Sequence, residues 1–304
     1  MRVNGGNIIL SSDTRRNYLR HDSLDYSITS ISPEFKKSKG GNSSVFWLTP
    51  QDGSELAIKF SKYDVSDKNA VAKNATRIER FEREIDALVR AKTNGFQNVI
   101  EYYFKGEFSI GNRRFPYYVM ERAETDLTTY LEINDVTLQQ RFLLCVSILK
   151  GIQELHGERI YHRDIKPDNI LLVNNEWKVG DLGLVKFQDS DFDIDEIGER
   201  VGPRDWLSPE AYNKCLTEKV KGNRPFEFDC AIEAESDVYQ LGKLFWFIFQ
   251  GNLPEGQLLR KDFRLADKAL YDVISNMLWH SKEKRYSLKE IEDGFKTRYS
   301  HYGI

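Results

Sequence analysis

One short stretch of the chain gathers side chains suited to metal binding and proton transfer. Residues 161–169 read Tyr-His-Arg-Asp-Ile-Lys-Pro-Asp-Asn, and an apolar run, an Asn-Asn pair at 174–175 and a second short strand separate them from Asp181. Because asparagine tolerates positive φ, this pair predicts the turn of a β-hairpin. The hairpin would place Asn169 almost opposite Asp181, and a proline keeps the loop that carries Asp164 out of a helix. We therefore expect two carboxylates and one amide to meet at one end of this hairpin.

These three side chains divide into a metal site and a proton acceptor. Carboxylate and amide oxygens are hard ligands that suit Mg²⁺, so Asn169 and Asp181 are the predicted metal ligands. Asp164 lies close by but free of the metal, where it could accept a proton from a hydroxyl group. An isolated Asp and Asn at this spacing would indicate only a turn. The nine clustered residues and the Asp-Leu-Gly that follows argue against that simpler interpretation.

A lysine on a strand and a glutamate on a helix form a second candidate pair. Lys59 closes a mostly apolar strand, where a charge is costly unless it is paired. Glu84 lies three residues after Phe81 and four before Leu88, so it shares the apolar face of a predicted helix. Alone, Glu84 would equally fit a solvated helix charge. Together the two residues predict a buried ion pair.

A run of small residues precedes the strand that begins near Val45. Its members are Ser38, Lys39, Gly40, Gly41, Asn42 and Ser43. Small side chains there let backbone N–H groups approach phosphate oxygens. A glycine-rich hairpin is more often only a turn. The following strands, which lead to Lys59, favour the phosphate-binding interpretation.

The elements that must position these groups change in type along the chain. Apolar strands at 45–48 and 56–60 flank a Gln-Asp-Gly turn, and a second hairpin is predicted over 108–120. A helix with apolar residues at 78–88 interrupts these strands. Beyond residue 121 the pattern is mainly helical, with one long amphipathic helix over 142–155. A strand-rich part followed by a helical part predicts an α+β fold in two lobes.

The predicted boundaries follow this change of pattern. Residues 1–27 are polar and form an extension or a docked arm, two alternatives that the sequence leaves open. Residues 28–122 form the predicted strand-rich lobe, and residues 123–304 form the helical lobe.

The composition restricts the classes of partner. The 304 residues carry a formal charge of -3 and a pI of about 6.1, so no global basic field indicates nucleic acid or a membrane surface. Three widely spaced cysteines indicate neither a disulfide framework nor a zinc site. The most apolar window, 244–249, is too short to cross a bilayer and predicts a helix buried on all sides. With no signal-peptide pattern at the start, we expect a cytoplasmic protein. The sequence does not indicate an oligomeric state.

The motif His-Arg-Asp-Ile-Lys-Pro-Asp-Asn with a later Asp-Leu-Gly resembles the catalytic loop and metal-binding motif of eukaryotic-type protein kinases. The resemblance implies a bilobal kinase fold, with a small antiparallel sheet and one helix in the first lobe. It implies a protein serine/threonine kinase that transfers the γ-phosphate of ATP to protein hydroxyl groups with Mg²⁺. Asp164 would be the catalytic base, Asn169 and Asp181 would hold Mg²⁺, and Lys166 would neutralise the γ-phosphate. Leu182 replaces the usual phenylalanine.

The resemblance also assigns the ATP side. Lys59 and Glu84 correspond to the family's ion pair, which orients the lysine toward the α- and β-phosphates. The segment from Ser38 to Val45 is similar to the glycine-rich loop, although only Gly40 matches a family glycine. The remaining expected nucleotide contacts are Ala57, the gatekeeper Met120, the hinge residues Glu121 and Ala123, and Asp126 at the ribose.

Three motifs extend the resemblance through the second lobe, over about residues 28–298. They are Ser208-Pro209-Glu210, Asp237 at the start of a buried helix, and Arg285, which would pair with Glu210. The compact chain resembles stand-alone bacterial kinases of eukaryotic type.

Three departures from the family pattern concern the substrate side. Pro203 stands where a threonine normally bridges the catalytic Asp and Lys, and we expect Asp205 or an ordered water to substitute. Between Asp181 and Ser208 the only hydroxyl side chain is Ser190, and six acidic residues lie close to it, at positions 189–199. We expect one of these acids to bind Arg163, which in the family often binds a phosphorylated loop; a solvated acidic loop is the alternative. The polar connection 213–235 is longer than usual and would shape a substrate or partner surface.

Two other functions compete with an active protein kinase. A pseudokinase scaffold would bind nucleotide without transfer, and the altered glycine loop and Pro203 favour it. The four residues whose loss would support it, Lys59, Asp164, Asn169 and Asp181, are all present. A small-molecule phosphotransferase on the same fold would lack the catalytic-loop and second-lobe motifs found here.

Overall fold

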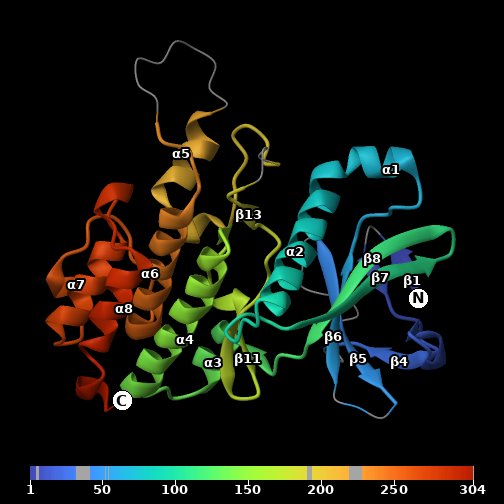
Figure 1. Ribbon diagram of the computed structural model, residues 1–304, viewed down its shortest axis with the longest axis horizontal. Coiled ribbons are helices and arrows are strands. Elements are labelled where there is room, and N and C mark those ends of the chain that lie inside the picture. The colour runs from blue at the N-terminus through green and yellow to red at the C-terminus, as the bar shows by residue number, and fades with distance from the viewer. Residues whose placement is uncertain are drawn as a thin grey trace. The chain divides into compact units, whose positions relative to one another are not determined.

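The computed structural model in Figure 1 divides the chain into two compact units. The first comprises Met1–Asn94 and Ile100–Glu124, and the second comprises Gly95–Val99 and Thr125–Ile304. The structure describes residues 1–4, 7–31, 42–51, 53, 55–189, 194–218 and 228–303. A strand-rich first unit and a helical second unit confirm the predicted α+β fold.

The first unit is built on a six-stranded antiparallel sheet with the strand order β3-β4-β5-β6-β8-β7. The strands are β3 (Tyr18–His21), β4 (Leu24–Thr29), β5 (Ser43–Pro50), β6 (Leu56–Ser61), β7 (Tyr102–Ile110) and β8 (Arg113–Glu121). The hairpins β5–β6 and β7–β8 are the two that the sequence predicts. Gly111, with φ of 62°, supplies the positive φ in the second turn.

Residues before position 28, which we expected to be an extension or a docked arm, contribute strands to this unit. β3 and β4 form an antiparallel hairpin, and β4 pairs with β5, so they continue the sheet. Before them, β1 (Arg2–Asn4) and β2 (Asn7–Ile9) form a separate two-stranded pair. Ile8 and Leu19 are buried in the core of the unit.

The strand register places the apolar core on one face of the sheet and the expected ligand-binding residues on the other. Side chains alternate between faces along a strand, and directly paired residues share a face. The buried core of the unit lies on one face and includes Phe46, Ile58, Phe60, Tyr117 and Val119. The other face carries Val45, Lys59 and Tyr118 in one cross-strand row and Trp47, Ala57 and Met120 in the next.

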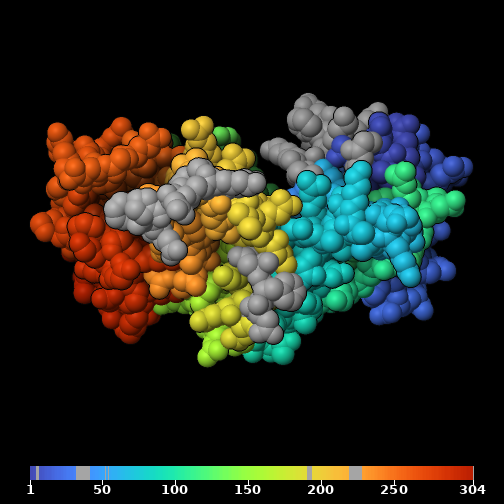
Figure 2. Space-filling view, turned by 90° about the horizontal axis from the view of Figure 1, so that it is seen from above, coloured from blue at the N-terminus to red at the C-terminus, as the bar shows by residue number. Residues whose placement is uncertain are grey.

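One long helix, α2 (Ala75–Thr93), packs against β7 within the first unit (Figure 1). It buries Phe81, Glu84, Ile85 and Leu88, which confirms the predicted inward face. The short helix α1 (Lys68–Lys73) precedes it, has no buried residue and lies on the surface, in cyan in Figure 2. The alternation of apolar and charged residues in α2 therefore turns Glu84 toward the interior.

The second unit contains the remaining helices and five short strands, which form two small sheets. The helices are α3 (Leu127–Ile133), α4 (Leu138–Gly157), α5 (Pro209–Thr217), α6 (Ala234–Gln250), α7 (Lys268–Met277) and α8 (Leu288–Lys296). The strands are β9 (Thr125–Asp126), β10 (Ile160–Tyr161), β11 (Ile170–Val173), β12 (Glu176–Val179) and β13 (Lys186–Phe187). β11 pairs with β9 and β12, and β10 pairs with β13.

Helices α4 and α6 run side by side in the middle of this unit (Figure 1). A capping box of Thr137 and Gln140 starts α4, as expected for a Thr-x-x-Gln sequence. Helix α6 ends at Gly251, whose φ of 75° suits a residue without a side chain. Leu244, Phe245, Trp246 and Ile248 are at most 2% exposed, which confirms the predicted buried helix. In the described residues, no helix combines the length and apolarity needed to cross a membrane.

Candidate active site

The predicted hairpin is present and brings Asn169 next to Asp181 along the backbone. β11 and β12 are antiparallel, with Ile170 opposite Val179. The turn residues at 174–175 have φ of 50° and 64°, as the asparagines predict. The N–H of Gly180 donates to the carbonyl of Asn169 at 2.8 Å, so Asp181 follows directly after a residue paired with Asn169.

The carboxylate of Asp164 is held through one oxygen only. Its Oδ2 accepts hydrogen bonds from Lys166 Nζ at 2.8 Å and from Asn169 Nδ2 at 3.0 Å. The same Nδ2 donates to the backbone carbonyl of Asp164 at 2.8 Å. In the described part of the chain, the buried Oδ1 has no hydrogen-bond partner. One oxygen of this carboxylate is therefore fixed, and the other keeps its lone pairs for a further donor.

Burial raises the pKa of Asp164 above its ordinary value of 3.8. The ammonium of Lys166 opposes that increase, and the carboxylate of Asp181 adds to it by repulsion. A carboxylate with a raised pKa is a better proton acceptor, and the charge of Lys166 favours its ionised form.

Asn169 and Asp181 offer the donor chemistry that Mg²⁺ requires. Both hydrogen bonds of the Asn169 side chain use Nδ2, so Oδ1, the atom that would bind a metal, accepts none in the described structure. Asp181 is exposed and carries φ of 51°. The described residues include no group of three or more His, Cys, Asp or Glu side chains arranged to hold a metal. This set fits Mg²⁺, which commonly takes one or two carboxylates and completes its shell with water and substrate phosphates.

Two side chains of helix α6 bind the backbone of residues 162–165, in the expected catalytic loop. Asp237 accepts from the N–H groups of His162 and Arg163, each at 2.7 Å. Gln240, one turn later, accepts from the N–H of Ile165 at 2.9 Å and donates to the carbonyl of Arg163 at 3.2 Å. The sequence comparison with the family identified Asp237. It missed Gln240, whose signal is a buried amide among the apolar residues of α6.

The ion pair predicted between Lys59 and Glu84 is present in the first unit. Lys59 Nζ lies 2.6 Å from Glu84 Oε1, with side chains that are 8% and 2% exposed. The hydroxyl of Tyr118 donates to the same oxygen at 2.9 Å, and the Lys59 ammonium lies 5.9 Å from the centre of the Tyr118 ring. Sequence reasoning missed Tyr118. Its cross-strand position beside Lys59 was the available signal.

Four residues of the expected glycine-rich loop, Ser38, Lys39, Gly40 and Gly41, lie outside the described residues. Asn42 is described: its carbonyl accepts from the N–H of Lys62 at 3.2 Å, and its side chain accepts from the Tyr63 hydroxyl at 2.6 Å. Ser43 begins β5. The sheet face opposite the core carries Val45, Ala57, Lys59 and Met120. Residues that bind one ligand must lie on the same face, as these do.

The expected hinge and ribose residues have local structural partners. Glu121 is buried, and its side chain accepts from the N–H of Glu101 at 2.6 Å. Ala123 lies two residues later, in the last part of the first unit. Asp126 caps α3 and accepts from the N–H of Thr129 at 2.8 Å. A hinge that recognises adenine by backbone groups would leave the Glu121 side chain free for this structural contact.

The loop between the metal-binding motif and α5 supplies an acidic partner for Arg163. The guanidinium of Arg163 and the carboxylate of Asp195 form an ion pair, and their side chains are 2% and 3% exposed. This is the type of contact that we expected from the acidic loop. Ser190, Asp191 and Asp193 lie outside the described residues.

Our expectation that Asp205 substitutes for the missing threonine hydroxyl is not supported. Asp205 is exposed, and no hydrogen bond joins it to Lys166 in the described chain. Its charge acts instead on Lys243, where burial lowers the pKa and Asp205 opposes that decrease. The Asp164 carboxylate is held by Lys166 and Asn169 directly, without a residue at position 203.

The predicted pair between Arg285 and Glu210 is also present and anchors α5. Arg285 Nη2 lies 2.6 Å from Glu210 Oε1, and both side chains are buried. Arg285 further donates to the carbonyls of Trp279, Glu235 and His280. The pair therefore fixes α5 and the start of α6 to the segment around Arg285.

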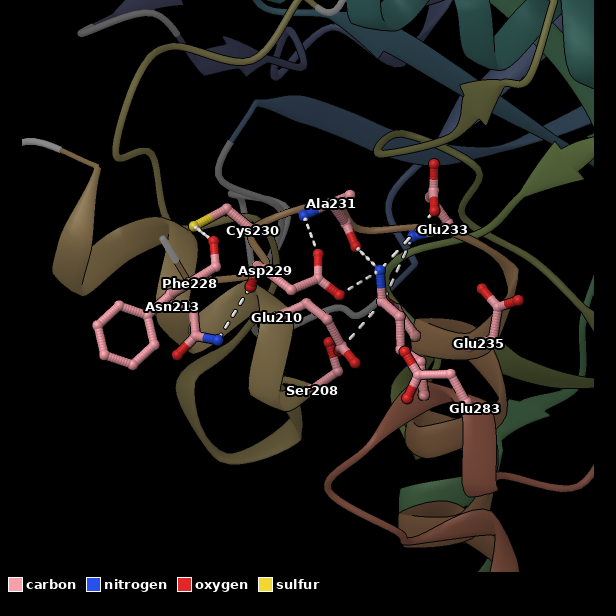
Figure 3. A network of polar contacts seen from close by, with 12 residues as sticks. Ser208, Glu210, Asn213, Phe228, Asp229, Cys230, Ala231, Glu233, Glu235 and Glu283 are labelled. Atoms are coloured by element: carbon pink, nitrogen blue, oxygen red, sulfur yellow. Dashed lines mark hydrogen bonds and ion pairs between the residues drawn. The ribbon is translucent and has the colours of Figure 1, made fainter. Parts of the chain in front are cut away.

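A neighbouring polar network orders the described end of the connection 213–235 (Figure 3). Asn213 donates to the carbonyl of Asp229 at 2.9 Å. The ammonium of Lys282 lies 2.9 Å from Asp229 Oδ2 and 3.7 Å from Glu233 Oε2, and donates to the carbonyl of Ala231 at 2.5 Å. This network gives the residues before α6 a defined path.

Comparison with known proteins gives one consistent result. A family model described as the protein kinase domain matches residues 38–295. The serine/threonine-protein kinase mph1 of Schizosaccharomyces pombe is 28% identical over 230 residues, which cover 72% of this chain and 31% of that protein. The dual specificity protein kinase Ttk of Danio rerio is 24% identical over 272 residues, covering 84% of this chain and 26% of that protein.

A probable serine/threonine-protein kinase of Streptomyces coelicolor is 29% identical over 198 residues, covering 64% of this chain and 26% of that protein. The chain thus spans about a quarter to a third of the length of these relatives. The family match covers well over half of the chain. It includes the loop around Asp164, the buried ion pairs and the α6 residues that bind the loop backbone. The chain belongs to the protein kinase family.

Proposed function

We propose that this chain is an ATP-dependent protein serine/threonine kinase that works with Mg²⁺. The observation that carries the proposal is the asymmetric Asp164 carboxylate, with Oδ2 fixed by Lys166 and Asn169 and Oδ1 left without a partner in the described structure. The intact Lys59–Glu84 pair supports it. The names of the relatives include serine/threonine and dual specificity kinases, so the residue type of the acceptor needs its own test.

The proposed reaction uses the Asp164 oxygen that has no partner. Oδ1 accepts the proton of a substrate hydroxyl as the hydroxyl oxygen bonds to the γ-phosphorus. The bond from that phosphorus to the bridging oxygen breaks, and ADP leaves. Lys166 is tied to Asp164 Oδ2 and would place its positive charge near the transferred group. Positioning and charge stabilisation supply most of the rate in such a transfer.

Most of the proposed nucleotide contacts belong to the first unit. Lys59 would bind the α- and β-phosphates, and Glu84 and Tyr118 would hold its ammonium in place. Bound Mg²⁺, held by Asn169 and Asp181, would neutralise charge on the phosphates. Val45, Ala57 and Met120 would contact the adenine, and Glu121, Ala123 and Asp126 would complete the nucleotide site.

We also propose that Asp195 takes the part that a phosphate plays in many kinases. Its carboxylate already pairs with Arg163 in a buried site. A permanent anion at this position would order the loop without a modification. Activity would then not require phosphorylation of Ser190.

Intact-mass spectrometry after incubation with Mg-ATP tests the proposed function. The wild-type chain should gain one or more HPO₃ groups, whereas an Asp164→Ala variant should gain none. Phosphoamino-acid analysis should then find phosphoserine or phosphothreonine; phosphotyrosine would indicate dual specificity.

Mg-dependent stabilisation by ATP, without transfer to the chain or to added protein substrates, would instead identify a nucleotide-binding scaffold. Equal mass gains in both chains would indicate a contaminating kinase. In that case the measurement should be repeated with a more highly purified protein.

A further inference from the structure

A single side chain of helix α6 joins the two peptide units that flank the proposed catalytic base. The N–H of Ile165 donates to Gln240 Oε1 at 2.9 Å, and Gln240 Nε2 donates to the carbonyl of Arg163 at 3.2 Å. The first group belongs to the peptide after Asp164, and the second belongs to the peptide before it. Gln240 therefore connects the backbone on both sides of the Asp164 Cα atom.

This connection restricts the direction in which the carboxylate points. Only φ and ψ of Asp164 are soft between two planar peptide units, so a rotation about either angle would break a bond to Gln240. Gln240 is 2% exposed, so water cannot readily replace a broken bond. A buried donor or acceptor left without a partner costs ~1–3 kcal/mol.

The same amide lies where the loop before α5 passes the catalytic loop. Gly202 adopts φ of 98°, and a Cβ atom there would lie 3.3 Å from the carbonyl oxygen of Arg163 and 3.8 Å from Gln240 Nε2. Gly202 immediately precedes Pro203, which has no side-chain hydroxyl to hold Asp164 or Lys166. Gln240 thus binds the backbone around Asp164 from α6, whereas Pro203, in the loop before α5, has no hydroxyl group to offer.

Asp237 does not duplicate this function. It binds the N–H groups of His162 and Arg163, which lie before the base, and within the described residues no hydrogen bond joins it to the peptide that follows Asp164. Among the described side chains, Gln240 holds the N–H of Ile165 and thereby fixes the far side of the base. The two residues share one face of α6, three positions apart.

We propose that Gln240 is a positioning residue that sets the orientation of Asp164 for proton acceptance. This role rests on the proposed kinase function. It differs from a purely structural role because its loss changes phosphoryl transfer more than it changes folding or nucleotide binding.

The test compares Gln240→Met with Gln250→Met, a matched change in the same helix. Gln250 is also buried, and its Oε1 accepts from the N–H of Arg264, away from the catalytic loop. Both variants keep side-chain volume and lose polar contacts. We expect Gln240→Met to lower the single-turnover transfer rate by on the order of 10- to 100-fold. Its KM for ATP should remain near the wild-type value, and Gln250→Met should keep the wild-type rate.

Amide hydrogen exchange supplies a readout that does not depend on activity. The Ile165 amide should exchange faster in Gln240→Met than in wild type or in Gln250→Met, at similar Tm in the two variants. If Gln240→Met does not fold, Gln240→Asn, which is too short to reach both peptide groups, should show the same selective loss of rate.

Equal transfer rates in the Gln240 and Gln250 variants would overturn the positioning role while leaving the proposed function intact. Unchanged exchange at Ile165 would also overturn it. A wild-type chain that transfers no phosphate would overturn the proposed function, and with it this role.

Discussion

Two buried carboxylates in this molecule, Glu84 and Asp164, each pair with a lysine, but the pairs are built in different ways. Lys59 and Glu84 are 25 positions apart in the chain and meet through the packing of α2 on the sheet. Lys166 and Asp164 are neighbours in one loop, whose backbone is held by side chains of α6. The first pair depends on tertiary packing, and the second depends on backbone hydrogen bonds.

The partners of the two carboxylates also differ. Glu84 Oε1 accepts from both Lys59 and Tyr118, so this oxygen holds the lysine in place. Asp164 takes Lys166 and Asn169 on Oδ2 and leaves Oδ1 without a hydrogen-bond partner within the described residues. This difference separates a carboxylate that positions a cation from one that is available to accept a proton.

Removing the cation of the first pair should have the largest combined effect. Lys59→Met leaves Glu84 buried without its main counter-charge, which costs ~3–5 kcal/mol of unfolding free energy. Transfer should fall by about 10²-fold or more, because the phosphates lose a positioning group. Chemical denaturation and steady-state kinetics measure both effects. Lys150→Met, an exposed change on α4, is the control and should alter neither.

The acidic partner of Arg163 should have the next largest effect. Asp195→Asn removes the anion from a buried pair, and a loss of ~1.4 kcal/mol in the active arrangement would lower kcat about tenfold. Ser190→Ala should keep full kcat, because the proposed anion is already in the sequence. Collapse of activity in Ser190→Ala, with Asp195→Asn unaffected, would show that loop phosphorylation is required.

The pH dependence of kcat should report the raised pKa of Asp164. A base must be deprotonated, so activity should be lost as pH falls through this pKa, which burial moves above 3.8. Lys166 opposes that increase, so Lys166→Met should move the acid limb of the profile to higher pH. Profiles at saturating ATP for wild type and Lys166→Met test the shift. An acid limb that moves to lower pH would contradict the assignment.

Tyr118→Phe should give the smallest effect on activity. The change removes one hydrogen bond to a charged carboxylate, for an expected loss of about 1–3 kcal/mol of unfolding free energy. The KM for ATP should rise only modestly, because Lys59 keeps its direct contact with Glu84. Tyr26→Phe is the matched control, since the Tyr26 hydroxyl has no hydrogen-bond partner in the described structure and the ring is similarly buried. Equal losses in both variants would show that the Tyr118 hydroxyl contributes nothing specific.

The sequence predicts the parts of the fold and site that depend on local patterns. Turn residues at 174–175, the alternation in β5 and β6 and the helical spacing around Glu84 each specify a local geometry that the structure contains. Glu210 and Arg285 were predicted to pair only through family resemblance, because 75 residues separate them in the chain.

Contacts between distant segments account for what the sequence did not predict. Gln240 and Tyr118 each lie in an apolar pattern, and their polar partners come from other elements. Asp205 was expected near Lys166 because Pro203 lacks the hydroxyl that would bridge Asp164 and Lys166, but its charge acts on Lys243. A polar side chain in an apolar element therefore signals a partner without identifying it.

The role of Asp164 as proton acceptor is tested by the single-turnover rate of phosphoryl transfer in Asp164→Asn, measured together with the variant's affinity for Mg-ATP. Asparagine keeps an acceptor for Lys166 but cannot accept a proton. Asp272→Asn, which changes a surface carboxylate paired with Lys268 on α7, is the control. If Asp164 is the base, the rate should fall by roughly 10²- to 10⁴-fold while nucleotide affinity stays near the wild-type value. A wild-type rate in Asp164→Asn would contradict it.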